Sequence, residues 1–105
     1  MSQKRRTELD EAAVAESRDR VARPPRYRVL LHNDDFTTME FVVYVLTTVF
    51  RMNDAEAVRV MLQVHTEGTG VAGIYPFEIA ESKARKVVEM ARAEQFPLMC
   101  SIQEE

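Results

Sequence analysis

Alternating apolar residues predict a β-strand over residues 27–32. Tyr27, Val29 and Leu31 fall on one face of this strand, as expected for a face that packs on a core. The opposite face carries Leu30 between two polar residues, so we expect this face to be partly covered as well.

A first helix is predicted to begin at Thr37. Thr37 and Glu40 have the spacing of a capping box, in which each side chain bonds the backbone N–H of the other residue. Apolar residues then recur with the period of a helix, which predicts one buried face formed by Phe41, Val42, Val45, Leu46, Val49 and Phe50.

A second helix is predicted after Asn53, which has the spacing of a similar cap with Glu56. Gly68 stands where the end of this helix needs a left-handed residue. Between these limits we expect a stripe of helical spacing, formed by Val58, Met61, Leu62 and His65.

The last third of the chain predicts a strand, a helix and a final strand. The first strand covers residues 70–75, and Pro76 then stands where a helix can open. Pro97 ends this helix, and residues 98–103 alternate as a strand does. The expected buried stripe of the helix is Ala80, Ala84, Val87, Val88 and Ala91.

The resulting order, β-α-α-β-α-β, predicts an α+β fold. Three strands cannot bury a sheet without help, and three amphipathic helices supply the cover. We therefore expect a sandwich of a three-stranded, mostly antiparallel sheet covered by three helices.

Residues 1–23 carry many charges and few apolar residues. Such a segment buries too little apolar surface to offset the entropy of ordering. Pro24 and Pro25 then stop any helix before the first strand. We expect residues 1–23 to be a flexible N-terminal extension and residues 24–105 to be one domain.

The formal net charge of −3 is unevenly distributed along the chain. Residues 27–105 hold seven basic and twelve acidic residues, so the field of the predicted domain favours cationic partners. This balance argues against a nucleic-acid module, and no apolar run approaches the roughly 20 residues of a membrane helix. Cys100 is the only cysteine, which excludes an internal disulfide and a metal site built on cysteine pairs.

Asn33, Asp34 and Asp35, here named the acidic rim, directly follow the first predicted strand. An ordinary turn uses these residue types, because their side chains bond nearby backbone and tolerate unusual dihedral angles. The same residues also set an amide and two carboxylates on a rigid edge, which suits a small cationic group such as an amine. Sequence spacing leaves both interpretations open.

Met39 and His65 are candidates to complete a site at the acidic rim. Met39 lies in the first turn of its predicted helix, where a flexible thioether suits a pocket for large apolar groups. His65 ends the stripe of the second helix, although a histidine there is also typical of the edge of a core. Spacing does not show whether the rim and the histidine meet.

Catalysis has little support in the sequence. Asp34 and Asp35 are adjacent and point apart, which makes a poor acid–base pair, and Cys100 has no positive neighbour that would activate it. A metal-dependent hydrolase using Asp34, Asp35 and His65 remains an alternative, although no second histidine has ligand spacing. A third alternative is a structural domain, because the element order is similar to that of the C-terminal domain of the ribosomal stalk protein.

Residues 24–105 resemble the ClpS family, bacterial adaptors that hand N-degron substrates to the ClpA/ClpP unfoldase-protease. The resemblance runs through the chain in order and rests on Pro24-Pro25, Tyr27-Arg28-Val29-Leu30-Leu31, Asn33-Asp34-Asp35-Phe36-Thr37, Met39-Glu40-Phe41-Val42, Met61-Leu62, Val64-His65, Glu78-Ile79-Ala80-Glu81-Ser82-Lys83, Pro97-Leu98 and Cys100. Three positions are noted as departures. Thr38 and Pro76 stand where many members have a proline and a threonine, respectively, and Ala72 stands where a small residue or a cysteine is usual.

The resemblance implies a role for each of these positions. Asn33, Asp34 and His65 would bind the free α-amino group of a substrate whose first residue is Leu, Phe, Tyr or Trp. Met39 would act as a gate that disfavours Ile and Val, and Glu78 and Lys83 would contact the N-terminal domain of a ClpA-type unfoldase. The implied lining of the pocket for the first side chain is Asp35, Thr37, Met39, Val42, Met61, Val64 and Leu98.

The resemblance also implies the class of the protein. It is expected to be a non-catalytic, monomeric adaptor of the cytoplasm that needs no metal or cofactor. Its partners are expected to be the unfoldase and N-degron peptides and proteins, with no nucleic acid and no membrane. The N-terminal extension is expected to be needed for delivery.

Overall fold

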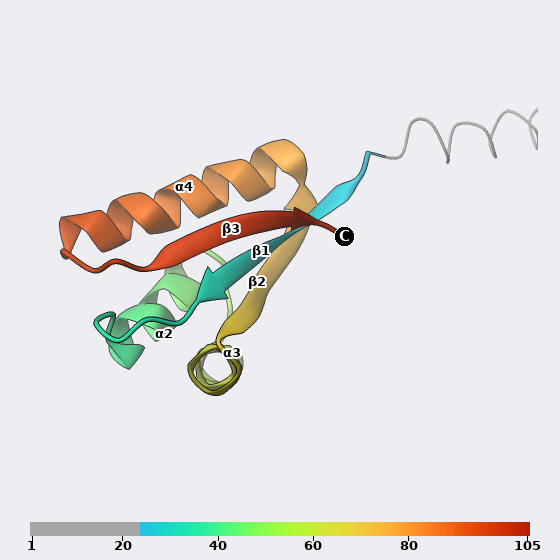
Figure 1. Ribbon diagram of the computed structural model, residues 1–105. Helices are drawn as coiled ribbons and strands as arrows, with labels where there is room; N and C mark the ends of the chain where they lie inside the picture. The colour runs from blue at the N-terminus through green and yellow to red at the C-terminus, as the bar shows by residue number, and fades with distance from the viewer. Residues whose placement is uncertain (1–23) are drawn as a thin grey trace, which may run out of the picture.

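The computed structural model describes residues 24–105 and confirms the predicted order of elements (Figure 1). The flexible extension expected at residues 1–23 lies outside the described residues. Among the described residues, no helix has both the length and the apolar character needed to cross a membrane. The elements are β1 (Arg26–His32), α2 (Met39–Thr48), α3 (Asp54–Glu67), β2 (Thr69–Pro76), α4 (Phe77–Ala93) and β3 (Met99–Glu104).

The three strands form one antiparallel sheet, as the sequence predicted, and the structure gives their order as β2-β1-β3. The register places His32, the last residue of β1, opposite Thr69 on β2 and Met99 on β3. The two outer strands therefore both begin at the end of the sheet where β1 ends.

One face of the sheet packs against the helices and forms the core. Val29 and Leu31 of β1 are fully buried, and they share one cluster with buried residues of all three helices. In Figure 1, α4 runs along the sheet while α2 and α3 lie below it, and α4 contacts all three strands. Leu30, on the other face, is half-buried, which confirms that this face is partly covered.

The predicted cap of α2 at Thr37 is wrong by one residue. The N-cap is Thr38, whose Oγ1 accepts the Phe41 N–H at 3.1 Å. The Thr37 hydroxyl instead donates to the Asp34 carboxylate at 2.7 Å. An ionised carboxylate is a stronger acceptor than a neutral group, so Thr37 is drawn to the rim and the next threonine caps the helix.

The buried face of α3 also differs from the predicted stripe. Val58 and Leu62 are exposed, and Met61 is the one apolar residue of the predicted stripe that is buried. The sequence of α3 offers two overlapping stripes of helical spacing, and the one containing a small alanine packs on the sheet. The buried residues are Ala57, Val60, Met61 and Val64.

The backbone of β2 lies directly against α3 at Gly70. A Cβ atom at this position would stand 2.7 Å from Val64 Cγ2 and 3.4 Å from the Val60 carbonyl oxygen. Gly70 is buried, so the absence of a side chain sets the distance between α3 and the sheet. Gly68, two residues earlier, ends α3 with φ 91°, as predicted for a left-handed cap.

We predict that Gly70→Ala destabilises the fold by about 1–3 kcal/mol, because the added methyl group forces Val64 and α3 away from the sheet. The matched control is Gly68→Asn, since asparagine tolerates the left-handed conformation and nothing lies within 4 Å of the added Cβ. Urea unfolding measures both changes. An unchanged midpoint for Gly70→Ala would show that α3 does not need this close approach.

Candidate functional site

A backbone hydrogen bond holds the acidic rim against the end of α3. The Asn33 N–H donates to the Gly68 carbonyl at 2.9 Å, and the Gly68 N–H donates to the Val64 carbonyl at 2.9 Å. The first bond continues the pairing of β1 with β2 beyond His32. The rim is therefore fixed to the last turn of α3 by the sheet itself.

His65 lies in that last turn and its side chain is exposed. It precedes Gly68 by three residues, which is a rise of about 4.5 Å along a helix. The bond between Asn33 and Gly68 thus brings the rim to within about one helical turn of His65. The fold therefore brings together the acidic rim and the last turn of α3, which sequence spacing could not predict.

The Asp34 carboxylate organises the loop between β1 and α2. Its Oδ1 accepts the N–H groups of Phe36 and Thr37 at 2.8 and 2.7 Å, and its Oδ2 accepts the Thr37 hydroxyl. Burial alone would raise the pKa of Asp34, but these hydrogen bonds outweigh burial and lower the pKa below its ordinary value. A carboxylate offers about four acceptor positions, so one position on Oδ2 remains for an incoming donor.

Asp35, the last residue of the rim, differs from Asp34. Its side chain is exposed, and no hydrogen bond to its carboxylate is found within residues 24–105. The three adjacent rim residues therefore have distinct settings: Asn33 is tied through its backbone, Asp34 through its carboxylate, and Asp35 projects at the surface.

The apolar residues predicted to line a pocket come from α2, from α3 and from the segment before β3. Met39 is the first residue of α2 and is 42% exposed, whereas Val42, one turn later, is buried. Met61 and Val64 are buried on α3. His32 pairs with Met99 at the end of the β1–β3 ladder, and Leu98, the residue before Met99, is also buried.

This corner combines hydrogen-bond acceptors with an apolar wall. An ammonium group has only donors and needs acceptors. Suitable acceptors are the oxygen of an amide, the oxygens of a carboxylate and the unprotonated nitrogen of a neutral imidazole. Met39 is half-exposed and Thr37 is half-buried. The arrangement suits a ligand that carries a positive charge next to an apolar group.

The groups that would support covalent or metal chemistry are not arranged for it. Burial raises the pKa of the Cys100 thiol to about 12, so the thiolate nucleophile is scarce at neutral pH. Within residues 24–105, no group of three or more His, Cys, Asp and Glu side chains is placed to hold a metal ion.

Glu78 and Lys83 lie away from the acidic rim. Glu78 is exposed in the first turn of α4, two residues after Pro76, which pairs with Arg26 at the start of β1. The rim follows the other end of β1, so seven strand residues, or about 20 Å, separate the two places.

Lys83 has a structural contact that sequence reasoning missed. Its Nζ donates to the Val49 carbonyl at 2.8 Å and lies 5.1 Å from the centre of the Tyr75 ring and 5.8 Å from that of Phe50. Val49 is the C-cap of α2, so Lys83 ties α4 to the end of α2. Lys83 and Lys86 look alike in sequence, and only the packing of α2 distinguishes them.

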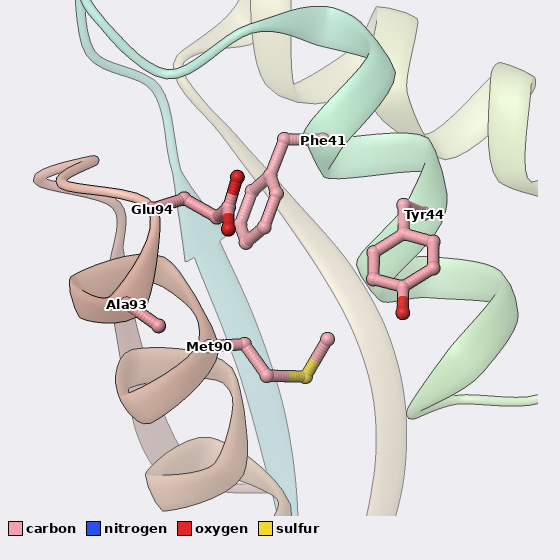
Figure 2. A pocket seen from close by; sticks show the side chains of 5 residues that line it. All are labelled: Phe41, Tyr44, Met90, Ala93 and Glu94. Atoms are coloured by element: carbon pink, nitrogen blue, oxygen red, sulfur yellow. The ribbon is translucent and has the colours of Figure 1, made fainter.

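A hollow between α2 and α4 was also missed (Figure 2). It is lined by Phe41, Tyr44, Met90, Ala93 and Glu94. Tyr44 is 55% exposed, and such a large aromatic side chain outside the buried stripe of α2 is the signal that sequence offered.

The fold and the site define a small binding module with an acceptor-rich corner. The chain matches the family described as ATP-dependent Clp protease adaptor protein ClpS over residues 22–101. It is 50% identical over 95 residues to the ATP-dependent Clp protease adapter protein ClpS of Methylococcus capsulatus, covering 90% of each chain. It is 47% identical over 105 residues to the protein of the same name from Ruegeria pomeroyi, covering 100% of this chain and 93% of the relative. The chain therefore belongs to the ClpS family of Clp protease adaptors, which are not enzymes.

A solved relative has the same fold. The structure of Agrobacterium tumefaciens ClpS2 bound to L-phenylalaninamide is 40% identical in sequence and superposes with a TM-score of 0.76. The match covers 78% of this chain and 99% of that protein. It confirms the α+β fold that the sequence predicted.

We predict that the stabilising effect of Asp34 depends on pH. Because its pKa is lowered from 3.8 in the folded protein, Asp34 stabilises the fold above that value and loses this effect as the pH falls through the folded pKa. Unfolding of the wild type and of Asp34→Asn, measured from pH 6 to pH 3, should show a difference that shrinks at the acidic end. A difference that stays constant would contradict this role of the charge.

We predict that Lys83→Met destabilises the fold by about 0.5–2 kcal/mol, because the Val49 carbonyl loses a charged donor. Methionine keeps the apolar stem of the side chain. Lys86→Met is the matched control, since Lys86 is exposed on the same helix. Equal thermal unfolding of the two variants would show that the bond to Val49 contributes nothing.

Proposed function

We propose that this protein binds the free N-terminal amine and the large apolar first side chain of N-degron substrates and delivers them to a ClpA-type unfoldase working with ClpP. The observation that carries the proposal is the hydrogen bond from Asn33 to Gly68, which joins the acidic rim to the turn that holds His65. Membership of the ClpS family supports the adaptor role. The phenylalaninamide bound by the Agrobacterium relative carries the same pair of features, a free amine and an aromatic side chain.

The amine is received by the Asn33 amide oxygen, the His65 imidazole and the remaining Oδ2 acceptor of Asp34. Three acceptors match the three donors of an ammonium group. The exposed carboxylate of Asp35 is a second candidate for the charge, because its acceptors are not used in the loop. Acetylation of the amine removes the charge and leaves the acceptors that the bound peptide covers without partners, which costs more than the loss of one methylene contact.

The first side chain enters the apolar wall beside the rim. Burial of a Leu or Phe side chain contributes roughly 1.5–3 kcal/mol, and each charge-assisted hydrogen bond contributes about as much. After the costs of association, these terms are consistent with a dissociation constant near 1 μM, about −8 kcal/mol. Met39 is half-exposed, and in this proposal it forms the entrance to the apolar pocket and acts as the gate against β-branched Ile and Val. The proposed lining is Asp35, Thr37, Met39, Val42, Met61, Val64 and Leu98.

Delivery uses the other end of the sheet. Glu78, exposed at the start of α4, and Lys83 form the contact with the N-terminal domain of the unfoldase. Because β1 separates them from the acidic rim, a substrate and the unfoldase can be held together by one adaptor molecule. In this proposal the protein acts as a monomer in the cytoplasm, and residues 1–23 serve the transfer step.

We predict that a peptide beginning with Phe binds at least about a hundredfold more tightly than its N-acetylated twin, because the acetylated amine has neither the charge nor the donors that the rim requires. A third peptide that begins with Ile should bind weakly, because of the gate. Fluorescence anisotropy measures all three affinities. Equal binding of the free and acetylated peptides would exclude the proposed function.

The variants separate the acceptors in the same assay. His65→Ala should lose most of the affinity for the Phe peptide, whereas the matched change Glu67→Ala, at an exposed position of the same turn, should not. Asp34→Asn and Asp35→Asn, compared side by side, show which carboxylate binds the positive charge of the amine.

Calorimetry with Zn²⁺ and Mn²⁺ addresses the hydrolase alternative, since a tight metal site at Asp34, Asp35 and His65 would contradict an adaptor.

A further inference from the structure

Basic side chains gather in a small hollow at the C-terminal end of α2, here named the basic hollow. It has a volume of about 270 Å³ and is lined by Thr48, Val49, Arg51, Ser82, Lys83 and Lys86. No Asp or Glu is among these residues. Residues 27–105 hold seven basic and twelve acidic residues, so three of the seven positive charges meet at one place in an acidic domain.

Lys83 presents its charge to the basic hollow from a fixed position. Its Nζ donates to the Val49 carbonyl at 2.8 Å and lies near the rings of Phe50 and Tyr75, and the side chain is half-buried. An ammonium group has three donors, so two remain after the bond to Val49. The contact that ties α4 to α2 therefore also prepares donors for a ligand.

Arg51 lines the basic hollow from the loop that follows α2. Its φ of 60° is the left-handed conformation that glycine or asparagine takes most readily. The side chain is exposed, so packing does not require an arginine at this position either. The residue type thus serves neither the turn nor the core, which leaves its charge as the property to be explained.

The end of α2 accounts for only part of this positive charge. α2 has no basic residue in its last turn, and Lys83 bonds its C-cap carbonyl instead. A helix end carries roughly half an elementary negative charge, whereas the basic hollow holds three full positive charges. Within residues 24–105, none of the three forms an ion pair with an acidic side chain, whereas Arg26 and Arg85 both do. An excess of positive charge remains, and it attracts an anion.

The basic hollow is separate from the candidate substrate site. Met39 is the first residue of α2 and Thr48 is the last, so the ten residues of the helix, or about 15 Å, lie between the two places. An anion in the basic hollow therefore needs no substrate at the acidic rim.

The donors of the basic hollow suit linked phosphate groups better than a carboxylate. A guanidinium fork binds two phosphate oxygens at once, and the two ammonium groups act as compact point charges. The hydroxyl groups of Thr48 and Ser82 are further donors. A carboxylate has only two oxygens and one charge, whereas each phosphate group brings up to three acceptor oxygens and more than one charge.

We propose that the basic hollow binds a small anion that contains two or three linked phosphate groups. The inference stands apart from the proposed function, because it requires neither a substrate nor the unfoldase. The hollow shares Lys83 with the proposed unfoldase contact, so the anion and that contact lie side by side.

The test is calorimetric titration of the full chain with inorganic triphosphate at low ionic strength, without metal ions. Triphosphate should bind at one saturable site, and the affinity should fall as NaCl is added. Sulfate at the same ionic strength should bind at least about tenfold more weakly, because a single tetrahedral anion engages only part of the donors. A peptide of four glutamates carries its charge on carboxylates and should also bind more weakly than triphosphate. Equal binding of sulfate or of this peptide would overturn the assignment to linked phosphates.

Two variants test the place of binding. Arg51→Asn and Lys86→Gln should each weaken triphosphate binding about three- to tenfold, the range expected for one exposed charged contact. Asparagine keeps the left-handed conformation accessible at position 51. The control is Arg92→Gln, which removes one positive charge at an exposed position of α4 outside the basic hollow and should leave binding nearly unchanged. Lys83 is left intact because it also holds α2 to α4, and thermal unfolding verifies that each variant is folded.

A second basic cluster in the sequence, Lys4-Arg5-Arg6, lies outside the described residues, so the bound anion must also be located. In an NMR titration, the amide signals of Arg51, Ser82 and Lys86 should shift together and saturate at the triphosphate concentration that calorimetry gives. The inference is overturned if the shifts are confined to residues 4–6, or if Arg51→Asn and Lys86→Gln weaken binding no more than Arg92→Gln does.

Discussion

The backbone bond between Asn33 and Gly68 connects the two halves of the candidate site, and much of the fold serves to hold that bond in place. It extends the hydrogen-bond ladder between β1 and β2. The register of these strands pairs residues about 40 positions apart in the chain, so the pairing is non-local. Two residues further along, Gly70 lets α3 lie against the strand. The position of His65 relative to the rim is therefore set by the sheet and by the missing side chain of one glycine.

The rim shows how three adjacent polar residues are given separate tasks. The Asn33 backbone is used by the sheet, which leaves its side-chain amide available. The Asp34 carboxylate is mostly used by the loop, where it orders the approach to α2 and draws Thr37 away from the helix cap. The needs of the turn therefore do not use all the acceptors of the rim, because the Asn33 amide and the Asp35 carboxylate take no part in these bonds.

Periodicity predicted the order of elements and the antiparallel sheet, because each element carries a clear repeat and most carry a turn or cap residue at the end. It failed where the local signal was duplicated. Thr37 and Thr38 are chemically equal as caps, and only the nearby Asp34 decides between them. The two apolar stripes of α3 are equal in spacing, and the stripe that is buried holds Val60 and Val64, the residues that lie against Gly70.

The candidate site was less predictable than the fold, for a physical reason. Asn33 and the last turn of α3 come together through strand pairing, which no local pattern encodes, and only the resemblance to a known family implied that they share a site. The bond of Lys83 to Val49 depends on how helices pack together and left no motif in the chain, and the hollow between α2 and α4 left only one signal, the aromatic Tyr44 outside the buried stripe of α2.

The length of β1 fixes the distance between the acidic rim at one end of the strand and the start of α4 at the other. On the proposed function, the first residue of a substrate is held about 20 Å from the surface that meets the unfoldase, with a rigid strand between them. An extended chain advances about 3.3–3.6 Å per residue, so about six residues are needed merely to draw level with that surface. A substrate whose folded domain starts directly after its first residue would have no unstructured segment that reaches the unfoldase. The length of one strand thus becomes a minimum leader length for the proteins that this adaptor can pass on.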